Sequence, residues 1–450
     1  MGHWFLRRLA LFGESEAIVA EGEPYSYRRL LEMVDEWRDY LGNHQVGPGE
    51  VVALESHFSP QACAGLLALV ERGAIVVPLT SLPAAKREEF HEIAQIQVVI
   101  TLEGMQGRRD FRRTARKAQH ELYERLRSDN RPGLVLFSSG SSGRSKASVL
   151  DFEQALGRYG EPKRERARRT LSFLNIDHIG GINTLLHTLN HGGAIITTSE
   201  RSPESVFAAI AKHEVNVLPT TPTFLNMVLI SGCCERYDTR SLHLITYGTE
   251  PMPFQTLQRL KATLPHVRFK QTYGLSELGI LPTKSQSDDT LWVKIGGSGF
   301  DYKIVEGILW IRSEMAMLGY LNAPAPFDEH GFFNTQDAVE QDGDYIRILG
   351  RDSEIINVAG EKVYPSEVEG VLLSAPNVAD ATVSGQSSPV TGMVVKATVR
   401  PVEDEDDQAM AQRLGRYCAQ RLEAFKVPVV IEVSRAQQHS ERFKKIRSTA

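Results

Sequence analysis

Short apolar runs alternate with amphipathic stretches as far as about residue 280. Val51–Leu54 and Ala74–Leu79 are runs of the length and composition of buried strands. Ser26–Leu41 places its apolar residues at helical spacing, and Ser59–Gly73 is a second predicted helix. Such alternation of strand and helix predicts an α/β fold with doubly wound parallel sheets, in which the apolar residues form the core.

The C-terminal part of the chain has a different pattern. Val378–Ser384 and Met393–Val399 are predicted strands, and Leu414–Phe425 is a predicted helix. With 450 residues, the chain is too long for one compact core. We therefore expect a small α+β domain after the larger α/β part.

The stretch from Leu134 to Leu150 carries the clearest candidate chemistry. Two apolar runs enclose a loop with five serines, two glycines, Arg144 and Lys146, so the stretch predicts strand, loop, strand. Glycine-rich backbone can wrap its N–H groups around an anion, while hydroxyls and cations add donors and charge. A phosphate is the expected ligand, and a flexible surface loop is the alternative. The loop is not a Walker A motif, because Ser145 and Ala147 flank the lysine.

This stretch resembles the phosphate-binding signature of the adenylate-forming superfamily, Thr-Ser-Gly-Ser/Thr-Thr-Gly-x-Pro-Lys-Gly. Ser145 and Ala147 depart from the usual proline and glycine. The resemblance implies a large N-terminal domain with a β-barrel-like subdomain, and a small mobile C-terminal domain. It also implies these contacts to the phosphates of ATP: Ser138, Ser139, Gly140, Ser141, Ser142, Gly143 and Lys146.

Two further segments resemble family signatures of the adenine site. The first is the turn Gly248-Thr249-Glu250 after an apolar run, which lies against the adenine ring in relatives. The second is Tyr273-Gly274-Leu275-Ser276-Glu277, which is near to Tyr-Gly-x-Thr-Glu. An aromatic face can stack on a base, a hydroxyl can reach an α-phosphate, and a carboxylate can bind Mg²⁺. These expectations fall on Tyr273, Ser276 and Glu277 respectively; a surface acid is the alternative for Glu277.

Asn175–Ile182 resembles the segment in which a histidine, here His178, borders the acyl pocket of relatives. A lone histidine is more often structural, so this assignment depends on the order of the signatures. Pro219–Phe224 resembles the turn before a pocket-lining helix. Amino-acid-activating relatives place an aspartate just after the histidine position, where this chain has Ile179. The implied substrate is an aryl or acyl carboxylic acid without an α-amino group, with Asp177 as a less favoured alternative anchor.

Signatures of the ribose site and of the hinge follow in order. Phe332–Asp337 resembles Phe-x-Thr-Gly-Asp, which implies that Asp337 accepts both ribose hydroxyls. The segment from Gly350 to Glu369 resembles the hinge signature; it contains Arg351, a further implied nucleotide contact, and Gly360 on the implied pantetheine path. The implied organisation is a large domain over 1–349, a hinge at 350–354 and a mobile domain over 355–450. Before these signatures in the chain, Gly307-Ile308-Leu309 and Gly319-Tyr320-Leu321-Asn322 resemble the signature Gly-Glu-Leu … Gly-Tyr-x-Asn. Departures from the signatures fall at Ile308, Gln336 and Ser353.

Ser440–Arg447 stands where relatives carry Thr-x-x-Gly-Lys-x-x-Arg. Phe443 replaces the glycine, and two lysines follow it. Spacing to Arg447 favours Lys444 as the mobile catalytic lysine, and Lys445 is the alternative.

Composition limits the possible partners. The formal net charge of −5 argues against a general nucleic-acid binder. The basic runs Arg108–Arg116 and Lys163–Arg169 are interpreted as solvated helix faces. Four cysteines fit no zinc pattern, and no apolar run approaches the roughly 18 residues of a membrane span. No signal peptide is recognised at the N-terminus, so we expect a cytoplasmic monomer or homodimer.

The resemblance implies a two-step reaction that uses ATP, Mg²⁺ and coenzyme A. A carboxylate attacks the α-phosphorus of ATP to give an acyl-adenylate and pyrophosphate, and a thiol then displaces AMP. One alternative is an enzyme that loads the phosphopantetheine of an acyl carrier protein. Another, suggested by the departures at Ile308, Gln336, Ser353 and Phe443, is a catalytically silent nucleotide-binding homologue.

Overall fold

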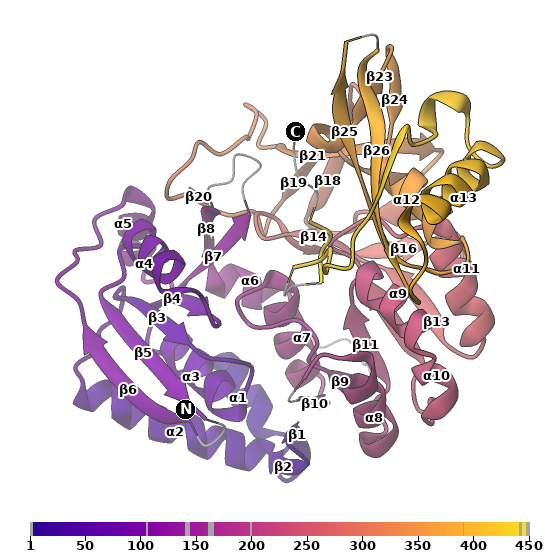
Figure 1. Ribbon diagram of the computed structural model, residues 1–450. Coiled ribbons are helices and arrows are strands. Elements are labelled where there is room, and N and C mark those ends of the chain that lie inside the picture. The colour runs from indigo at the N-terminus through magenta and orange to yellow at the C-terminus, as the bar shows by residue number, and fades with distance from the viewer. Residues whose placement is uncertain are drawn as a thin grey trace.

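The computed structural model describes residues 3–104, 107–139, 145–160, 166–198, 200–389, 391–440 and 443–446. Two seven-stranded sheets with flanking helices form most of the molecule, and the C-terminal elements form a smaller unit beside them (Figure 1). Mixed α/β architecture with a large and a small part agrees with the fold predicted from the sequence.

The first sheet carries the predicted phosphate loop. Its order is β20-β8-β7-β4-β3-β5-β6. Strands β7, β4, β3 and β5 pair in parallel, whereas β8, β20 and β6 are antiparallel to their neighbours. The bounds are β3 Val51–Glu55, β4 Ile75–Leu79, β5 Val98–Glu103, β6 Arg108–Arg113, β7 Gly133–Ser139, β8 Ser145–Asp151 and β20 Gly319–Tyr320.

The second sheet has the order β13-β12-β11-β9-β10-β1-β2 and is parallel except for β2. Doubly wound parallel sheets are therefore present, with antiparallel strands at sheet edges. The bounds are β1 Glu16–Ala20, β2 Glu23–Ser26, β9 Arg169–Leu171, β10 Ala194–Ile196, β11 Val217–Thr220, β12 Leu244–Tyr247 and β13 Arg268–Gln271.

Local sequence explains the helices that flank the first sheet. Ser26 and Ser59 are N-caps, and each hydroxyl accepts the backbone N–H three residues further on. Gly65 permits close packing of the second and third helices, because a Cβ there would lie 2.8 Å from the Trp37 ring. Helices of the large part are α1 Trp4–Ala10, α2 Tyr27–Asn43, α3 Pro60–Glu71, α4 Ala84–Ile93, α5 Glu121–Ser128, α6 Phe152–Gly157, α7 Ile179–Asn190, α8 Pro203–His213, α9 Pro222–Ser231, α10 Cys233–Arg236 and α11 Phe254–Thr263.

The large part also contains an antiparallel sheet with the order β16-β17-β22-β21-β19-β18. A short hairpin, β14–β15, precedes it and carries the Tyr273–Glu277 signature. The bounds are β14 Tyr273–Leu275, β15 Gly279–Leu281, β16 Thr283–Ser285, β17 Val293–Ile295, β18 Phe300–Val305, β19 Ile308–Ser313, β21 Phe333–Asp342 and β22 Tyr345–Arg351.

The C-terminal elements enclose a hydrophobic core of their own, which extends from Ile356 to Cys418. A short 3-10 helix, η1 Asp352–Glu354, joins them to β22. Their bounds are β23 Ile356–Val358, β24 Glu361–Val363, α12 Pro365–Leu373, β25 Val378–Ser388, β26 Gly392–Pro401, α13 Asp407–Ala419, η2 Ala424–Lys426 and β27 Val430–Val433.

Three expectations about elements were wrong. The run Lys163–Arg169 is no helix face where it is described, because 166–168 are irregular and Arg169 begins β9. Arg108–Arg113 is the edge strand β6, not a helix, because it pairs with β5 and places Arg109 over the Trp37 ring. The helix predicted at Leu414–Phe425 begins earlier, at Asp407, where Asp406 caps it, and it ends at Ala419. The helix starts with the exposed residues Asp407, Gln408 and Ala409, and Met410 is its first buried residue.

Candidate active site

The hairpin of β7 and β8 presents Ser138 and Lys146 as partners across an antiparallel ladder. Asn322 holds β8 from outside: its Oδ1 accepts the Ala147 N–H at 3.1 Å, and its Nδ2 donates to the Ser145 carbonyl at 2.8 Å. A side chain that binds two backbone groups fixes the strand that leaves the predicted phosphate loop. Four of the predicted phosphate contacts lie outside the described residues: Gly140, Ser141, Ser142 and Gly143. The side chain of a fifth, Ser139, also lies outside them.

Glu277, the predicted Mg²⁺ ligand, is 8% exposed and lies beside this hairpin. Its Oε1 accepts the Tyr320 hydroxyl at 2.7 Å and is 3.5 Å from the Ser138 hydroxyl. The Lys146 ammonium lies 5.4 Å from the centre of the Tyr320 ring. Burial raises the pKa of Tyr320, and the Glu277 charge raises it further, so the phenol remains a hydrogen-bond donor. Three separate signatures therefore meet at one carboxylate.

Asp337, the predicted ribose ligand, is 7% exposed on β21. It accepts a hydrogen bond from the Tyr273 hydroxyl, and its Oδ1 lies 3.1 Å from Arg351 Nε. Burial raises the pKa of Asp337, while the charges of Arg351 and Lys444 lower it and leave a net rise. The structure thus brings the predicted base, ribose and lysine positions together around one buried carboxyl group.

The turn after β12 shows why glycine stands in it. A Cβ on Gly248 would lie 2.7 Å from the carbonyl oxygen of Thr272, so any other residue would collide with the neighbouring chain. Thr249 follows with φ of +74° and an exposed side chain. Glu250 turns away from this surface: its Oε1 accepts the Thr223 N–H at 2.7 Å. Burial raises the pKa of Glu250.

The β14–β15 hairpin places the remaining nucleotide residues beside Glu277. A Cβ on Gly274 would lie 2.7 Å from the Gly279 carbonyl oxygen, so this glycine allows close pairing of the two strands. Ser276 is half-buried in the turn. Its predicted role toward an α-phosphate stays a prediction.

His178 caps α7, and its Nδ1 accepts the Gly180 N–H at 3.0 Å. This is a structural role of the kind that the sequence left open for a lone histidine. Asp177 is buried and accepts the Thr80 hydroxyl at 3.0 Å. Ile179 is buried at the first position of the helix.

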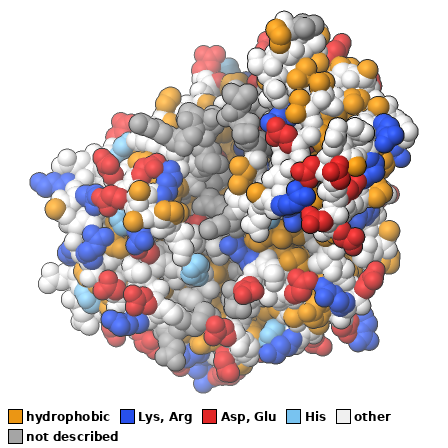
Figure 2. Space-filling model, viewed as in Figure 1, with side chains coloured by type: hydrophobic (Ala, Val, Ile, Leu, Met, Phe, Trp, Pro, Cys, Tyr) orange, Lys and Arg blue, Asp and Glu red, His pale blue; other side chains and the backbone are white. Residues whose placement is uncertain are grey.

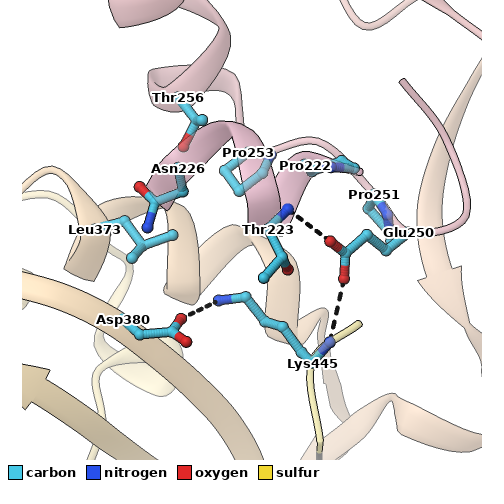
Figure 3. Close-up of a pocket in the computed structure, with 10 residues that line it drawn as sticks. All are labelled: Pro222, Thr223, Asn226, Glu250, Pro251, Pro253, Thr256, Leu373, Asp380 and Lys445. Atoms are coloured by element: carbon cyan, nitrogen blue, oxygen red, sulfur yellow. Dashed lines mark hydrogen bonds and ion pairs between the residues drawn. The ribbon is translucent and has the colours of Figure 1, made fainter. Parts of the chain in front are cut away.

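The adjacent lysines near the C-terminus have different surroundings. The side chain of Lys445 is 7% exposed, and its Nζ lies 3.3 Å from Asp380 Oδ1 and 3.8 Å from Glu369 Oε2. Its backbone N–H donates to Glu250 Oε2 at 3.3 Å. Figure 3 shows the Lys445 side chain in a pocket that also contains Asp380 and Glu250. Lys444, by contrast, acts electrostatically on Asp337.

Arg351 lies within the predicted hinge, and Gly360 follows it in the chain. Arg351 is the last residue of β22 and reaches back to Asp337. Gly360 has φ of +95° in the exposed turn between β23 and β24, which suits glycine. It belongs to the C-terminal unit, at the upper end of the molecule in Figure 1.

Tyr320 and Asn322 belong to the site, although no role was predicted for them from the sequence. Both belong to the Gly-Tyr-x-Asn signature at Gly319–Asn322, so the motif was visible although its function was not. Their contacts with Glu277 and β8 join segments more than 40 residues apart, which a motif cannot reveal.

Within the described residues, no cluster of three or more His, Cys, Asp or Glu side chains converges as a protein-only metal site would require. Magnesium commonly uses one or two carboxylates together with phosphates, so the buried oxygen ligand Glu277 fits that ion. Figure 2 shows acidic and basic side chains intermingled over the described surface in view. No described helix has both the length and the apolar character needed to cross a membrane.

The family model of the AMP-binding enzyme matches residues 5–321, and that of the AMP-binding enzyme C-terminal domain matches residues 367–444. The chain therefore belongs to the AMP-binding enzyme family.

Two curated relatives illustrate the range of this similarity. The chain is 27% identical to 4-coumarate–CoA ligase-like 9 of Arabidopsis thaliana over 56% of its own length, and it spans about half of that relative, 50%. It is also 27% identical to the fatty acid–[acyl-carrier-protein] ligase MmaC of Mycobacterium marinum, over 86% of this chain and 83% of the relative.

Two solved structures share the fold. The anthranilate CoA ligase AuaEII in complex with anthranoyl-AMP superposes with a TM-score of 0.83 at 18% identity, covering 98% of this chain and 95% of that one. The o-succinylbenzoate CoA synthetase MenE of Bacillus subtilis, in complex with its acyl-adenylate, has a TM-score of 0.78 at 21% identity, with coverages of 98% and 96%.

Proposed function

We propose that this protein activates a carboxylic acid with ATP to form an acyl-adenylate and then transfers the acyl group to the thiol of coenzyme A. The observation that supports this most is the buried Glu277, which lies beside the β7–β8 hairpin. The buried Asp337 is contacted by Tyr273 and Arg351, and the charge of Lys444 lowers its pKa. Membership of the AMP-binding enzyme family and the named CoA ligases among its relatives support the same reaction.

In the first step a substrate carboxylate oxygen bonds to the α-phosphorus, and the bond to the β-phosphate oxygen breaks. Lys444 supplies positive charge to both reacting groups and orients them for in-line attack. Ser138, Lys146 and the rest of the phosphate loop stabilise the negative charge that moves onto pyrophosphate. Asp337 would bind the ribose, and Glu277 would hold Mg²⁺, which would supply positive charge to the phosphates.

In the second step the thiolate sulfur bonds to the acyl carbon, and the bond to the AMP oxygen breaks. We propose a large domain over 1–349, a hinge at 350–354 and a small mobile domain over 355–450. The separate core of the small domain and the exposed short helix η1 support a rotation between the two steps. That rotation would replace Lys444 by the face that carries Gly360.

The substrate we propose is an aryl or medium acyl acid without an α-amino group. The relatives named for 4-coumarate, anthranilate and o-succinylbenzoate act on acids of this class. The experiment is carboxylate-dependent ATP–pyrophosphate exchange over a panel of aryl, acyl and amino acids. Exchange with an aryl or acyl acid supports the proposal, whereas no exchange with any acid favours the silent homologue.

A carrier protein is the second candidate thiol acceptor. MmaC, which is named as an acyl-carrier-protein ligase, matches 86% of this chain, more than the CoA ligase-like relative above. Once an acid is known, coenzyme A and a holo-carrier protein should be compared at equal thiol concentration. Faster thioester formation on the carrier would replace coenzyme A in our proposal.

A further inference from the structure

Phe443 adopts a backbone conformation that normally requires glycine. Its φ is +53°, in the left-handed region that L side chains rarely occupy. A bulky residue persists there only when its surroundings compensate for the strain. The side chain must therefore gain contacts that a glycine could not make.

Those contacts are with the large α/β part of the molecule. The Phe443 ring lies 5.1 Å from the ring of Phe173 and 5.6 Å from that of Phe224, both fully buried. The Thr221 hydroxyl donates to the Phe443 carbonyl at 3.0 Å, and the Arg201 guanidinium lies 5.5 Å from the ring centre. An aromatic side chain from the C-terminal segment is thus inserted at the start of α9.

Lys445 holds the same segment from the other side. Its ammonium binds Asp380 and the Ala381 carbonyl on β25 of the small unit, close to Glu369. The residues before and after Lys444 therefore attach their side chains to different parts of the molecule. The charge of Lys444 between them lowers the pKa of the Asp337 carboxyl. Figure 3 shows how Lys445 bridges Asp380 and Glu250 at this contact.

We propose that Phe443 is a positioning residue for adenylation: its ring anchors the C-terminal segment on the large domain and thereby sets the place of Lys444. This inference rests on the function proposed above. Because the small domain must rotate before thiol attack, the ring must leave Phe173 and Phe224 between the two steps. The anchor therefore favours the first half-reaction alone.

The test compares Phe443→Ala, Phe443→Gly and Phe443→Leu with the wild type in separate half-reactions. We expect Phe443→Ala and Phe443→Gly to slow pyrophosphate exchange by about 10- to 100-fold, since small displacements of a catalytic group have effects of this size. Thioester formation from supplied acyl-adenylate should change by no more than about twofold, and Phe443→Leu should recover part of the exchange rate.

Phe425→Ala is the matched control, because Phe425 is a half-buried aromatic packed against the small unit's own core. It should leave the ratio of the two half-reactions unchanged. Full activity of Phe443→Gly would show that only the backbone conformation matters, and would overturn the proposal. Equal losses in both half-reactions of Phe443→Ala would also overturn it.

Hydrogen exchange without substrates separates this inference from the proposed function. The backbone N–H groups of Lys445 and Ile446 are bonded to Glu250 and to the Gln438 carbonyl. Both should exchange faster in Phe443→Ala and at the wild-type rate in Phe425→Ala. Unchanged exchange in Phe443→Ala refutes the anchor. Faster exchange, in a protein that activates no acid of the panel, supports the anchor and refutes the proposed function.

Discussion

Two departures from the family signatures share a backbone property. Gln336 and Phe443 both stand where the signatures usually carry glycine, and both have positive φ, +59° and +53°. The left-handed conformation is therefore present at both sites although the residue type has changed. Gln336 is compensated by a hydrogen bond, since its N–H donates to Asn334 Oδ1 at 2.9 Å. Positive φ at both positions is compatible with the glycine of the two signatures, but the contacts that offset the strain come from side chains the motifs do not specify.

Gln336 gives a stability prediction. Its side chain is exposed, so substitutions there act mainly through the backbone. Gln336→Val should lower the free energy of unfolding by about 1–2 kcal/mol, because a β-branched residue fits the left-handed region poorly. Gln336→Gly should not lower it, because relief of strain offsets the greater entropy of the unfolded chain. Urea denaturation measures both, and a larger loss for glycine than for valine would contradict the argument.

The adjacent lysines should fail in different ways when each is removed. In Lys444→Ala, adenylation should slow because about 3–4 kcal/mol of transition-state stabilisation is lost. The stability of the fold should change little. Lys445→Ala removes the buried cation that pairs with Asp380, so the variant should unfold more easily by about 3–5 kcal/mol. Pyrophosphate exchange and thermal unfolding on both variants provide the measurement. The reverse pattern would mean that Lys445 is the catalytic lysine.

Asp337 gives a prediction about pH. Its pKa is raised by burial, and only the ionised form accepts two ribose hydroxyls. When the pH is lowered, ATP binding should therefore begin to weaken at a higher pH than it would with an ordinary aspartate, whose pKa is about 3.9. Arg351 lowers this pKa, so Arg351→Gln should move the loss of binding to still higher pH.

The control is Arg347→Gln on the same strand, since Arg347 pairs with Glu340 at the surface. Titration of ATP affinity against pH should leave this control at the wild-type midpoint. Asp337→Ala should weaken ATP binding at every pH. An unchanged affinity in that variant would remove Asp337 from the ribose site.

At the scale of elements, segments with their own local signals were predicted well. The helices after Ser26 and Ser59 begin one residue beyond capping serines. The two strands of the phosphate hairpin are present as expected, but they extend into the predicted loop as far as Ser139 and from Ser145. Arg108–Arg113 was misread because its charge dominates the pattern, whereas its structure depends on pairing with β5. Tertiary pairing of this kind overrides local composition and is not visible in a single segment.

Asn322 links β8, the strand that leaves the predicted phosphate loop, to the segment that follows β20. Asn322→Ala leaves the Ala147 N–H and the Ser145 carbonyl without their partner, which should cost about 1–3 kcal/mol of stability. Because this strand carries Lys146, the affinity for ATP should fall as well. Asn377→Ala is the matched control: Asn377 clamps backbone at Glu403 in the small unit. It should lose stability but keep its ATP affinity, as calorimetric titration would show.

At the scale of the whole molecule, the sequence predicted two unequal parts but not how they meet. Asn226 Nδ2 donates to the Ala379 carbonyl at 3.0 Å, and Glu250 accepts the Lys445 N–H, across more than 150 residues of chain. No motif encodes such contacts, because they depend on the orientation of one unit on the other. The C-terminal segment, which returns toward α9 in Figure 1, takes part in this arrangement.

Several elements line the expected acyl pocket, so the choice of substrate depends on how the whole molecule folds. Of the carboxylates near it, Asp177 accepts the Thr80 hydroxyl and Glu250 the Thr223 N–H. Ile179, the position that would pair with a substrate ammonium, is buried and apolar. Burying an ammonium there without a partner would cost several kcal/mol, on the order expected for an isolated buried charge. Pyrophosphate exchange with the common amino acids should therefore remain at background. Robust exchange with an α-amino acid, abolished by Asp177→Asn, would show instead that Asp177 anchors the substrate.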